Sequence, residues 1–210
     1  MENTAWVLDK LAEMYPEAKP ELNFTNPYET LIAALLSAQA TDRQVNVVTE
    51  KLFAAYPNAR ALAAADVADV EEMIRSIGLY HNKARNAVAA CQILMTKHNG
   101  EVPQTIDELT RLPGVGRKVA NVVLANAYGV PAFAVDTHVH RVSGRIGLAS
   151  SKNPLQTERQ LCEKIPPELW NETHLRLIYL GRRVCRAIKP SCAACPLAAE
   201  CAYANNKQSL

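Results

Sequence analysis

The sequence predicts an all-helical fold, and three observations carry that prediction. Apolar residues recur at helical spacing, capping residues stand where those runs begin, and no segment keeps the two-residue alternation of a half-buried strand. The chain has 210 residues, of which 49% are hydrophobic and 21% charged. A chain of this size and composition can bury a sizeable core and needs no disulfide to fold.

Helix starts are marked by capping residues along the chain. Asn26 before Pro27 opens one helix, and a capping box of Thr41 and Gln44 opens the next. Further helices are expected over residues 4–15, 67–75, 83–98, 155–164 and 168–187. Because the sequence has no low-complexity linker, two domains would have to share a continuous helical surface.

The segment 105–128 predicts a helix, a tight hairpin and a second helix. A capping box that starts at Thr105 begins the first helix, and the second covers about residues 117–128. Between them, Gly114 and Gly116 allow backbone conformations closed to other residues and leave backbone N–H groups uncovered at the positive end of the second helix. A phosphate fits such a site, and backbone contacts to phosphate position DNA without reading its sequence. The alternative is a hairpin that only needed a sharp turn.

Lys118 and Asp136 are the candidate catalytic residues. Lys118 lies in the first turn of the second helix, where the helix dipole and Arg117 disfavour an extra positive charge, and a neutral amine is a nucleophile toward an imine or anomeric carbon. The alternative is a lysine that binds phosphate as a point charge. Asp136 precedes an apolar-periodic run, so it is either an N-cap or a carboxylate that manages protons beside Lys118. His138 and His140 would face apart on a helix, and we interpret both as structural or surface residues.

Charge is distributed unevenly along the chain. The net charge is only +2, but residues 1–105 hold 9 basic and 13 acidic residues, and residues 106–210 hold 14 and 8. The first half therefore carries −4 and the second +6. From residue 173 to residue 190 there are five basic residues and no acidic one. This asymmetry favours a polyanionic partner, with a solvated basic face as the alternative.

The sequence shows no membrane or export signal. The longest apolar run, residues 31–36, is far shorter than the roughly 20 residues of a membrane-spanning helix. The N-terminus, with Glu2, Asp9 and Glu13, has neither the basic start nor the apolar middle of a signal peptide. We therefore expect a cytoplasmic protein with no membrane partner.

Four of the six cysteines crowd into the last 26 residues. Their spacing is Cys-x6-Cys-x2-Cys-x5-Cys, and the residues are Cys185, Cys192, Cys195 and Cys201. A disulfide is disfavoured in a cytosolic chain, and zinc sites usually contain two short knuckles where only one is present here. The uneven spacing favours a four-thiolate [4Fe–4S] loop, with zinc as the alternative. Cys91 and Cys162 are interpreted as small buried hydrophobes.

Taken together, the motifs resemble the endonuclease III family, the bifunctional DNA glycosylases and abasic-site lyases of the helix-hairpin-helix superfamily. The matching segments, in order, are residues 36–42, 77–80, 112–118 and 135–138, followed by the four cysteines. The resemblance implies an all-α glycosylase fold with a six-helix barrel domain over residues 20–130. It implies an iron–sulfur domain from residues 1–19 and 131–210, a cluster loop at 185–201, and a DNA cleft between the domains.

The resemblance also implies an activity: removal of oxidised pyrimidines from damaged duplex DNA in base excision repair. Lys118 would attack the sugar C1′ and form a Schiff base, Asp136 would assist, and β-elimination would cut 3′ to the abasic site. The base must leave the stack to be reached. Gln39 and Leu79 look like the groups that fill the resulting gap.

Further residues are weaker candidates for the same surface. Ser37 and Asp42 are candidates for the base pocket, and the candidate DNA contacts are Gly114, Val115, Gly116, Arg117, Arg141 and Arg186. We expect a monomer that associates with the nucleoid.

Three different kinds of protein compete with this activity at the level of sequence. Adenine-specific mismatch glycosylases share the hairpin and the cysteine spacing but typically lack the hairpin lysine and carry a further C-terminal domain. This sequence has Lys118 and stops nine residues after Cys201. The second kind is a non-catalytic helix-hairpin-helix DNA-binding module, and the third is a zinc-stabilised interaction protein.

Overall fold

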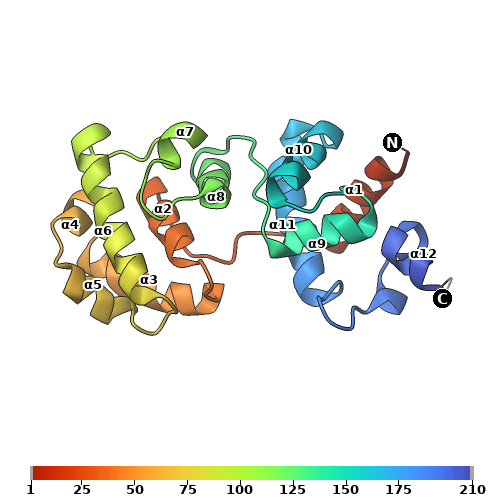
Figure 1. The fold of residues 1–210 in the computed structure, drawn as a ribbon, viewed down its shortest axis with the longest axis horizontal. Coiled ribbons are helices and arrows are strands. Elements are labelled where there is room, and N and C mark those ends of the chain that lie inside the picture. Colours follow the sequence, from red (N-terminus) through yellow and green to blue (C-terminus); the bar gives the residue numbers. More distant parts are fainter. Residues whose placement is uncertain (1, 209–210) are drawn as a thin grey trace. The chain divides into compact units, whose positions relative to one another are not determined.

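A computed structural model describes residues 2–208, and every regular element among them is helical (Figure 1), which confirms the predicted fold class. The α-helices are α1 (Glu2–Met14), α2 (Pro27–Leu36), α3 (Asp42–Ala55), α4 (Ala59–Ala63), α5 (Val67–Ile74), α6 (Tyr80–Lys97), α7 (Ile106–Leu109), α8 (Arg117–Tyr128), α9 (Thr137–Ile146), α10 (Pro154–Lys164), α11 (Trp170–Arg183) and α12 (Ala202–Gln208). Three short 3-10 turns lie at Pro167–Leu169, Cys192–Ala194 and Ala198–Glu200. Over the described part of the chain, no helix has the length and apolar content that a membrane span requires.

The chain divides into two compact units. The central unit is Pro20–Val130 and contains α2 to α8, and its fully buried side chains include Leu31, Leu36 and Leu94. The terminal unit combines the residues up to Lys19 with those from Pro131 onward, so it contains α1 and α9 to α12. In the terminal unit, α1 packs on α11, which brings the beginning of the chain into a core formed by its last third.

The helix starts predicted from capping residues are confirmed. The Asn26 side chain accepts a hydrogen bond from the Glu29 N–H at 3.0 Å, and Thr41 with Gln44 forms both bonds of a capping box at the start of α3. At the other end of a helix, Gly129 adopts the left-handed conformation that ends α8. These contacts are local, which is why the sequence alone revealed them.

Two of the predicted helix bounds differ from the structure by three residues or more. Helix α6 begins at Tyr80 rather than near residue 83, because Leu79 takes a left-handed conformation immediately before it. Helix α11 ends at Arg183 rather than near residue 187, because the chain turns there into the cysteine-rich segment. Helix α4 was not predicted, since its five residues are too short to show a helical period.

Candidate nucleic-acid interface and cysteine site

The hairpin between α7 and α8 lies in the central unit and requires glycine at its first glycine position. Gly114 has φ +76°, a left-handed conformation that L side chains rarely adopt. A Cβ atom at Gly114 would also lie 2.9 Å from the side-chain nitrogen of Asn86 on α6. The adjacent Val115 donates its N–H to the carbonyl of Leu112 at 3.1 Å and buries its side chain. Only the backbone of Val115 is therefore placed to contact a ligand.

Gly116 is present for a different reason. Its φ of −88° and ψ of 176° are ordinary extended values, so the expectation that both glycines supply special backbone conformations is wrong for this one. A Cβ atom at Gly116 would meet no other atom within 4 Å. Gly116 is the N-cap of α8 and makes no side-chain cap, so the first turn of this 12-residue helix faces open space. The absence of a side chain keeps the helix N–H groups accessible to an anion.

Lys118 is the second residue of α8 and its side chain is exposed. Among the described residues, no hydrogen bond or ion pair engages its ammonium group. The neighbouring Arg117 is exposed as well. Two cationic side chains thus stand at the positive end of a helix that begins with an open glycine.

Gln39 and Leu79 are brought together within the central unit. Helix α6, yellow-green in Figure 1, packs against α2, and the loops at the adjacent ends of these helices meet. A Cβ atom at Gly78 would lie 3.6 Å from the carbonyl oxygen of Gln39. Both Gln39 (φ +53°) and Leu79 (φ +59°) are left-handed, and Leu79 leaves 55% of its surface exposed. A strained, exposed leucine has no role in the core, so this pair points to a surface function.

The two weaker pocket candidates, Ser37 and Asp42, have different surroundings. The hydroxyl of Ser37 donates to the carbonyl of Ala34 at 2.7 Å, at the end of α2. Asp42 begins α3 and lines an open hollow whose other residues are Glu21, Asn23, Arg43, Asn46, Val47 and Glu50. Ser37 does not line that hollow.

Asp136 lies in the terminal unit and is the N-cap of α9. Its Oδ1 accepts a hydrogen bond from the Val139 N–H at 2.8 Å, so the structural interpretation of this residue is confirmed. No hydrogen bond reaches its Oδ2 from the residues that the structure describes. One oxygen therefore fixes the side chain while the other stays available, and the two interpretations of Asp136 are compatible.

The two histidines that follow are engaged within the terminal unit. The Nδ1 atom of His138 lies 3.1 Å from Nη2 of Arg141, and that of His140 lies 2.8 Å from the Thr157 hydroxyl. Burial lowers the pKa of His138, and Asp136 opposes this shift while Arg141 and Arg182 add to it. Both side chains serve packing and hydrogen bonding, as predicted from their spacing.

The predicted DNA contacts Arg141 and Arg186 have different environments. Arg141 is half-buried, and its Nη2 donates to the carbonyls of Gly181 at 3.0 Å and Cys185 at 3.2 Å. These bonds tie α9 to the C-terminal end of α11. Arg186 is exposed in the loop between the first two clustered cysteines and donates to the Ser191 hydroxyl at 3.4 Å.

Part of the basic run 173–190 is used inside the terminal unit. Arg176 forms an ion pair with Glu172 at 2.8 Å, and the guanidinium of Arg183 stacks on Tyr179 with 4.3 Å to the ring centroid. Arg186 and Lys189 are exposed in the loop that follows. The charge count therefore overstates the number of cations that are available to a partner.

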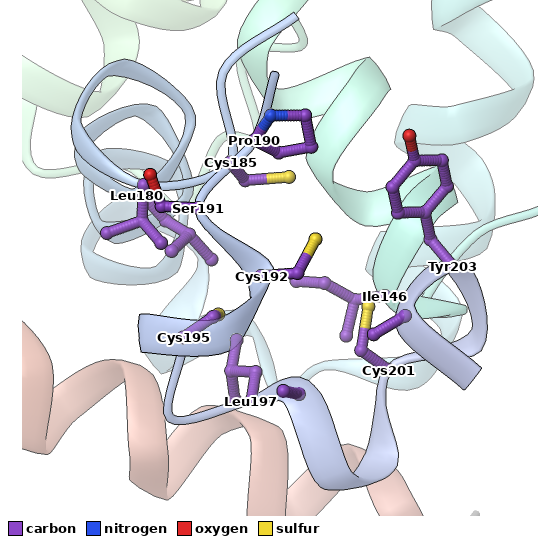
Figure 2. A pocket seen from close by; sticks show the side chains of 13 residues that line it. Ile146, Leu180, Cys185, Pro190, Ser191, Cys192, Cys195, Leu197, Cys201 and Tyr203 are labelled. Atoms are coloured by element: carbon purple, nitrogen blue, oxygen red, sulfur yellow. The ribbon is translucent and has the colours of Figure 1, made fainter. Parts of the chain in front are cut away.

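The four clustered cysteines line one cavity of the terminal unit (Figure 2). All are thiols rather than disulfides, and they come from the end of α11, from a 3-10 turn and from the segment before α12. Apolar side chains, among them Ile146, Leu180 and Leu197, line the same cavity. Burial raises the pKa of Cys195, and the nearby Cys201, Cys185 and Cys192 shift it in the same direction. Within the described residues, no three His, Cys, Asp or Glu side chains form a site for a single metal ion.

Arg145 and Tyr203 stand beside these cysteines and were not predicted. Nη1 of Arg145 lies 3.5 Å from the Cys185 sulfur, and its guanidinium carbon lies 4.6 Å from the Tyr203 ring centroid. The Cys201 thiol donates to the carbonyl of Arg145 at 3.4 Å. Arg145 follows Arg141 by one helical turn, so the two side chains lie on the same face of the helix. That spacing is the sequence signal that could have identified Arg145.

Comparison with known proteins gives a consistent result. A family model described as "HhH-GPD superfamily base excision DNA repair protein" matches residues 32–167. Endonuclease III of Bacillus subtilis (strain 168) is 48% identical over 195 residues, which cover 92% of this chain and 89% of that protein. Endonuclease III of Escherichia coli (strain K12) is 46% identical over 197 residues, covering 94% of this chain and 93% of that protein.

Solved structures agree with the sequence relatives. The structure of a trapped endonuclease III–DNA covalent intermediate superposes with a TM-score of 0.94 at 48% identity, covering 99% of this chain and 98% of the other. A non-covalent endonuclease III–DNA complex gives the same TM-score and identity over 100% and 98% of the two chains. Together with the matched motifs, these similarities show that the chain belongs to the endonuclease III family of base excision DNA repair enzymes.

Proposed function

We propose that this base-excision-repair DNA glycosylase and abasic-site lyase removes oxidised pyrimidines from duplex DNA through a Schiff base on Lys118. The observation that carries the proposal is an exposed lysine in the first turn of α8, two residues after an open glycine and without a partner among the described residues. The chain also superposes closely on a relative trapped as a covalent intermediate with DNA. Borohydride trapping on an abasic-site duplex tests the proposal, because it captures a Schiff base as a stable covalent adduct.

The chemistry proposed for Lys118 needs no reactant other than the damaged DNA and water. The neutral Nζ attacks C1′, the bond from C1′ to the base breaks, and the departing base takes up a proton. The C1′–O4′ bond of the sugar ring then opens, O4′ takes up the proton that the nitrogen loses, and the C1′=N bond of the Schiff base forms. The resulting Schiff base acidifies the proton on C2′. Loss of that proton breaks the C3′–O bond by β-elimination, and the 3′ phosphate leaves with the electron pair of that bond. Water then hydrolyses the imine and restores the amine.

We propose that Asp136 manages protons and developing positive charge in this reaction. Its Oδ1 is held by the Val139 N–H at 2.8 Å, which fixes the orientation of the carboxylate through the N-cap of α9. Its Oδ2 remains for the substrate. A carboxylate oriented by the backbone is pre-organised for this task.

The two units carry separate parts of this machinery. The central unit, which we propose to be the six-helix barrel of the family, holds Lys118, the hairpin, Gln39 and Leu79. The terminal unit, proposed to be the iron–sulfur domain, holds Asp136 and the four clustered cysteines. Arg141 and Arg186, both in the terminal unit, stay candidates for DNA contacts, and the exposed Arg186 is the better placed.

We propose that the open N-terminus of α8 binds a backbone phosphate of DNA. Gly116→Ala tests this directly, because a methyl group at the N-cap of α8 meets no atom within 4 Å beyond its chain neighbours and adds bulk beside the first turn of the helix. Duplex binding is expected to weaken by about tenfold, the scale of one hydrogen bond to a charged group, with little dependence on sequence. Binding titrations on several duplexes measure this effect.

Two further observations complete the test of Gly116. Gly144→Ala places the same methyl group in an open position on α9 and is expected to leave binding unchanged, with stability unchanged or slightly raised because alanine favours a helix interior. A Gly116→Ala variant that binds as tightly as the wild type would contradict the phosphate site. Gly114→Ala is less informative, because it also strains the backbone and crowds Asn86.

Leu79 and Gln39 are proposed to fill the gap that the extruded base leaves in the duplex. Leu79→Ala is expected to slow single-turnover base excision by about tenfold, since the apolar wedge that offsets lost stacking is removed. The unfolding temperature is expected to stay unchanged, because 55% of the Leu79 surface is exposed. Leu155→Ala on α10, at 41% exposure, is the matched control and is expected to excise normally. If the Leu79→Ala variant excises the base at the normal rate, Leu79 does not act as a wedge.

We propose that the four clustered cysteines hold a [4Fe–4S] cluster. They fit such a group, because four thiols line one cavity with apolar walls, and an arginine N–H lies near the Cys185 sulfur. When bound, the cluster cross-links the chain from Cys185 to Cys201 and so shapes the exposed loop that carries Arg186. The residues that line this cavity do not require the cluster to transfer electrons during base excision.

A further inference from the structure

Lys83 is a buried lysine that the proposed mechanism does not use. It lies in the first turn of α6, and only 4% of its surface is exposed. Its ammonium nitrogen is shielded from solvent and has no hydrogen-bond partner among the described residues. Burial lowers its pKa. An unpaired buried cation is costly, so its presence requires an explanation other than core packing.

Helix α6 packs on α2, and two observations near their ends indicate that the two helices run antiparallel. Burial raises the pKa of Tyr28 near the start of α2, and the charge of Cys91 on α6 adds to this shift, so these two residues lie within electrostatic range of each other. Eight residues before Cys91 lies Lys83, and eight residues after Tyr28 lies Leu36. Because both helices rise equally per residue, Lys83 is level with the last turn of α2.

The meeting of the two loops supports the same alignment. The Cβ position of Gly78 lies 3.6 Å from the Gln39 carbonyl oxygen, just beyond the adjacent ends of α6 and α2. Lys83 itself donates its backbone N–H to the Leu79 carbonyl at 3.1 Å. Lys83 therefore lies in the turn that directly follows Leu79, next to the place where the two left-handed turns meet, and its side chain is buried.

The last turn of α2 offers acceptors for a cation. The carbonyls of Ala33 and Ala34 accept the Ser37 N–H, but within the described residues no backbone N–H donates to those of Leu35 or Leu36. Such carbonyls form the negative end of the helix dipole, where a cation is favoured. A lysine level with this turn is electrostatically complementary to it.

We infer that Lys83 is a positioning residue for base extrusion, whose ammonium group holds the end of α2 against the start of α6 and thereby fixes Gln39 and Leu79. The inference rests on the gap-filling role proposed for those two residues. Lys83 itself touches neither substrate nor reacting atoms. It acts through the geometry of two strained turns, and misplacing a group by about 1 Å can cost up to about a hundredfold in rate.

Lys83→Met separates this role from a role in stability. Methionine keeps the length and apolar stem of lysine but removes the charge, and removing a desolvated charge does not cost stability near neutral pH. Burial lowers the pKa of Lys83 in the folded protein. Below the pKa that this lysine has in the unfolded chain, the unfolded chain therefore binds the proton more readily than the folded protein does, and the charge on Lys83 disfavours the folded state. Single-turnover excision is expected to fall about tenfold or more while the unfolding temperature stays unchanged or rises.

The matched control is Lys97→Met. Lys97 lies on the same helix, in its last turn, and is exposed, so excision and unfolding are both expected to match the wild type. Two outcomes overturn the inference: wild-type excision by Lys83→Met, or a loss of excision accompanied by a lower unfolding temperature.

A double-variant cycle with Leu79→Ala tests whether Lys83 acts through that residue. If it does, the combined variant excises about as fast as Leu79→Ala alone, because the second change removes the positioning of a side chain already gone. If the losses in excision rate of the two single variants multiply in the combined variant, the inference is overturned. If the Lys83→Met protein does not fold, the same cycle is carried out with Lys83→Leu.

Failure of this inference is distinguishable from failure of the proposed function. If the wild type forms a borohydride adduct that requires Lys118, and Lys83→Met excises normally, only the inference falls. If the wild type releases no oxidised pyrimidine at all, the proposed function falls first.

Discussion

Lys118→Gln is expected to abolish the borohydride-trapped adduct with an abasic-site duplex and to slow base excision by more than about a thousandfold. The reason is that glutamine keeps the size and polarity of the side chain but has no amine to attack C1′, and loss of a nucleophile has effects of this size or larger. The adduct is measured as a slower-migrating protein band on a denaturing gel, and excision as base release under single-turnover conditions.

The controls for Lys118 isolate its chemistry from DNA binding. Lys51→Gln changes an exposed lysine on α3 and is expected to trap as the wild type does. Lys118→Gln itself is expected to keep most of its duplex affinity, because the open N-terminus of α8 remains. A Lys118→Gln protein that traps as well as the wild type would show that another amine forms the Schiff base. A wild type that binds duplex DNA without an adduct would favour the non-catalytic module.

Cys195→Ala is expected to have the second-largest effect, through loss of bound iron. The wild type is expected to be brown with about four irons per chain, and the variant to be largely colourless, because a [4Fe–4S] cluster needs all four thiolates. Removing such a cross-link is expected to cost about 4 kcal/mol of stability, by analogy with a native disulfide in a small domain. For a chain of this size that corresponds to a lowering of the unfolding temperature of roughly 8–16 °C.

The matched control is the same substitution at a cysteine outside the group. Cys162→Ala on α10 is expected to keep the full iron content and the brown colour, with a smaller change in unfolding temperature. Iron analysis, the visible absorbance spectrum and thermal unfolding measure these quantities. A wild type that is colourless and holds stoichiometric zinc would contradict the cluster and favour a zinc-stabilised fold.

Much of the fold could be predicted because the deciding interactions are short in sequence. Thr41 with Gln44 and Asn26 with Glu29 form caps within three residues, so the starts of α3 and α2 are readable before any packing is known. The short α4 escaped prediction for the opposite reason, because five residues do not complete two helical turns. The end of α11 was misplaced because the partners that bind its last carbonyls come from α9, about 40 residues away.

The candidate site divides in the same way. Lys118, Asp136 and the four cysteines could be named from the sequence because each belongs to a compact motif with fixed spacing. The behaviour of Arg141 could not, since its half-buried guanidinium is engaged by the carbonyls of Gly181 and Cys185. The distinct requirements for Gly114 and Gly116 also needed the structure, because only Gly114 meets Asn86.

The helical class, the hairpin and the set of thiols and amines that carry chemistry follow from the order of the amino acids, because capping, helical period and motif spacing are local properties of the chain. The meeting of Gln39 with Leu79, and the burial of Lys83 without a partner among the described residues, emerge only in three dimensions. Both depend on which faces of α2 and α6 pack together. Such packing is set by the combined shapes of many side chains far apart in sequence, so no single segment of the chain contains it.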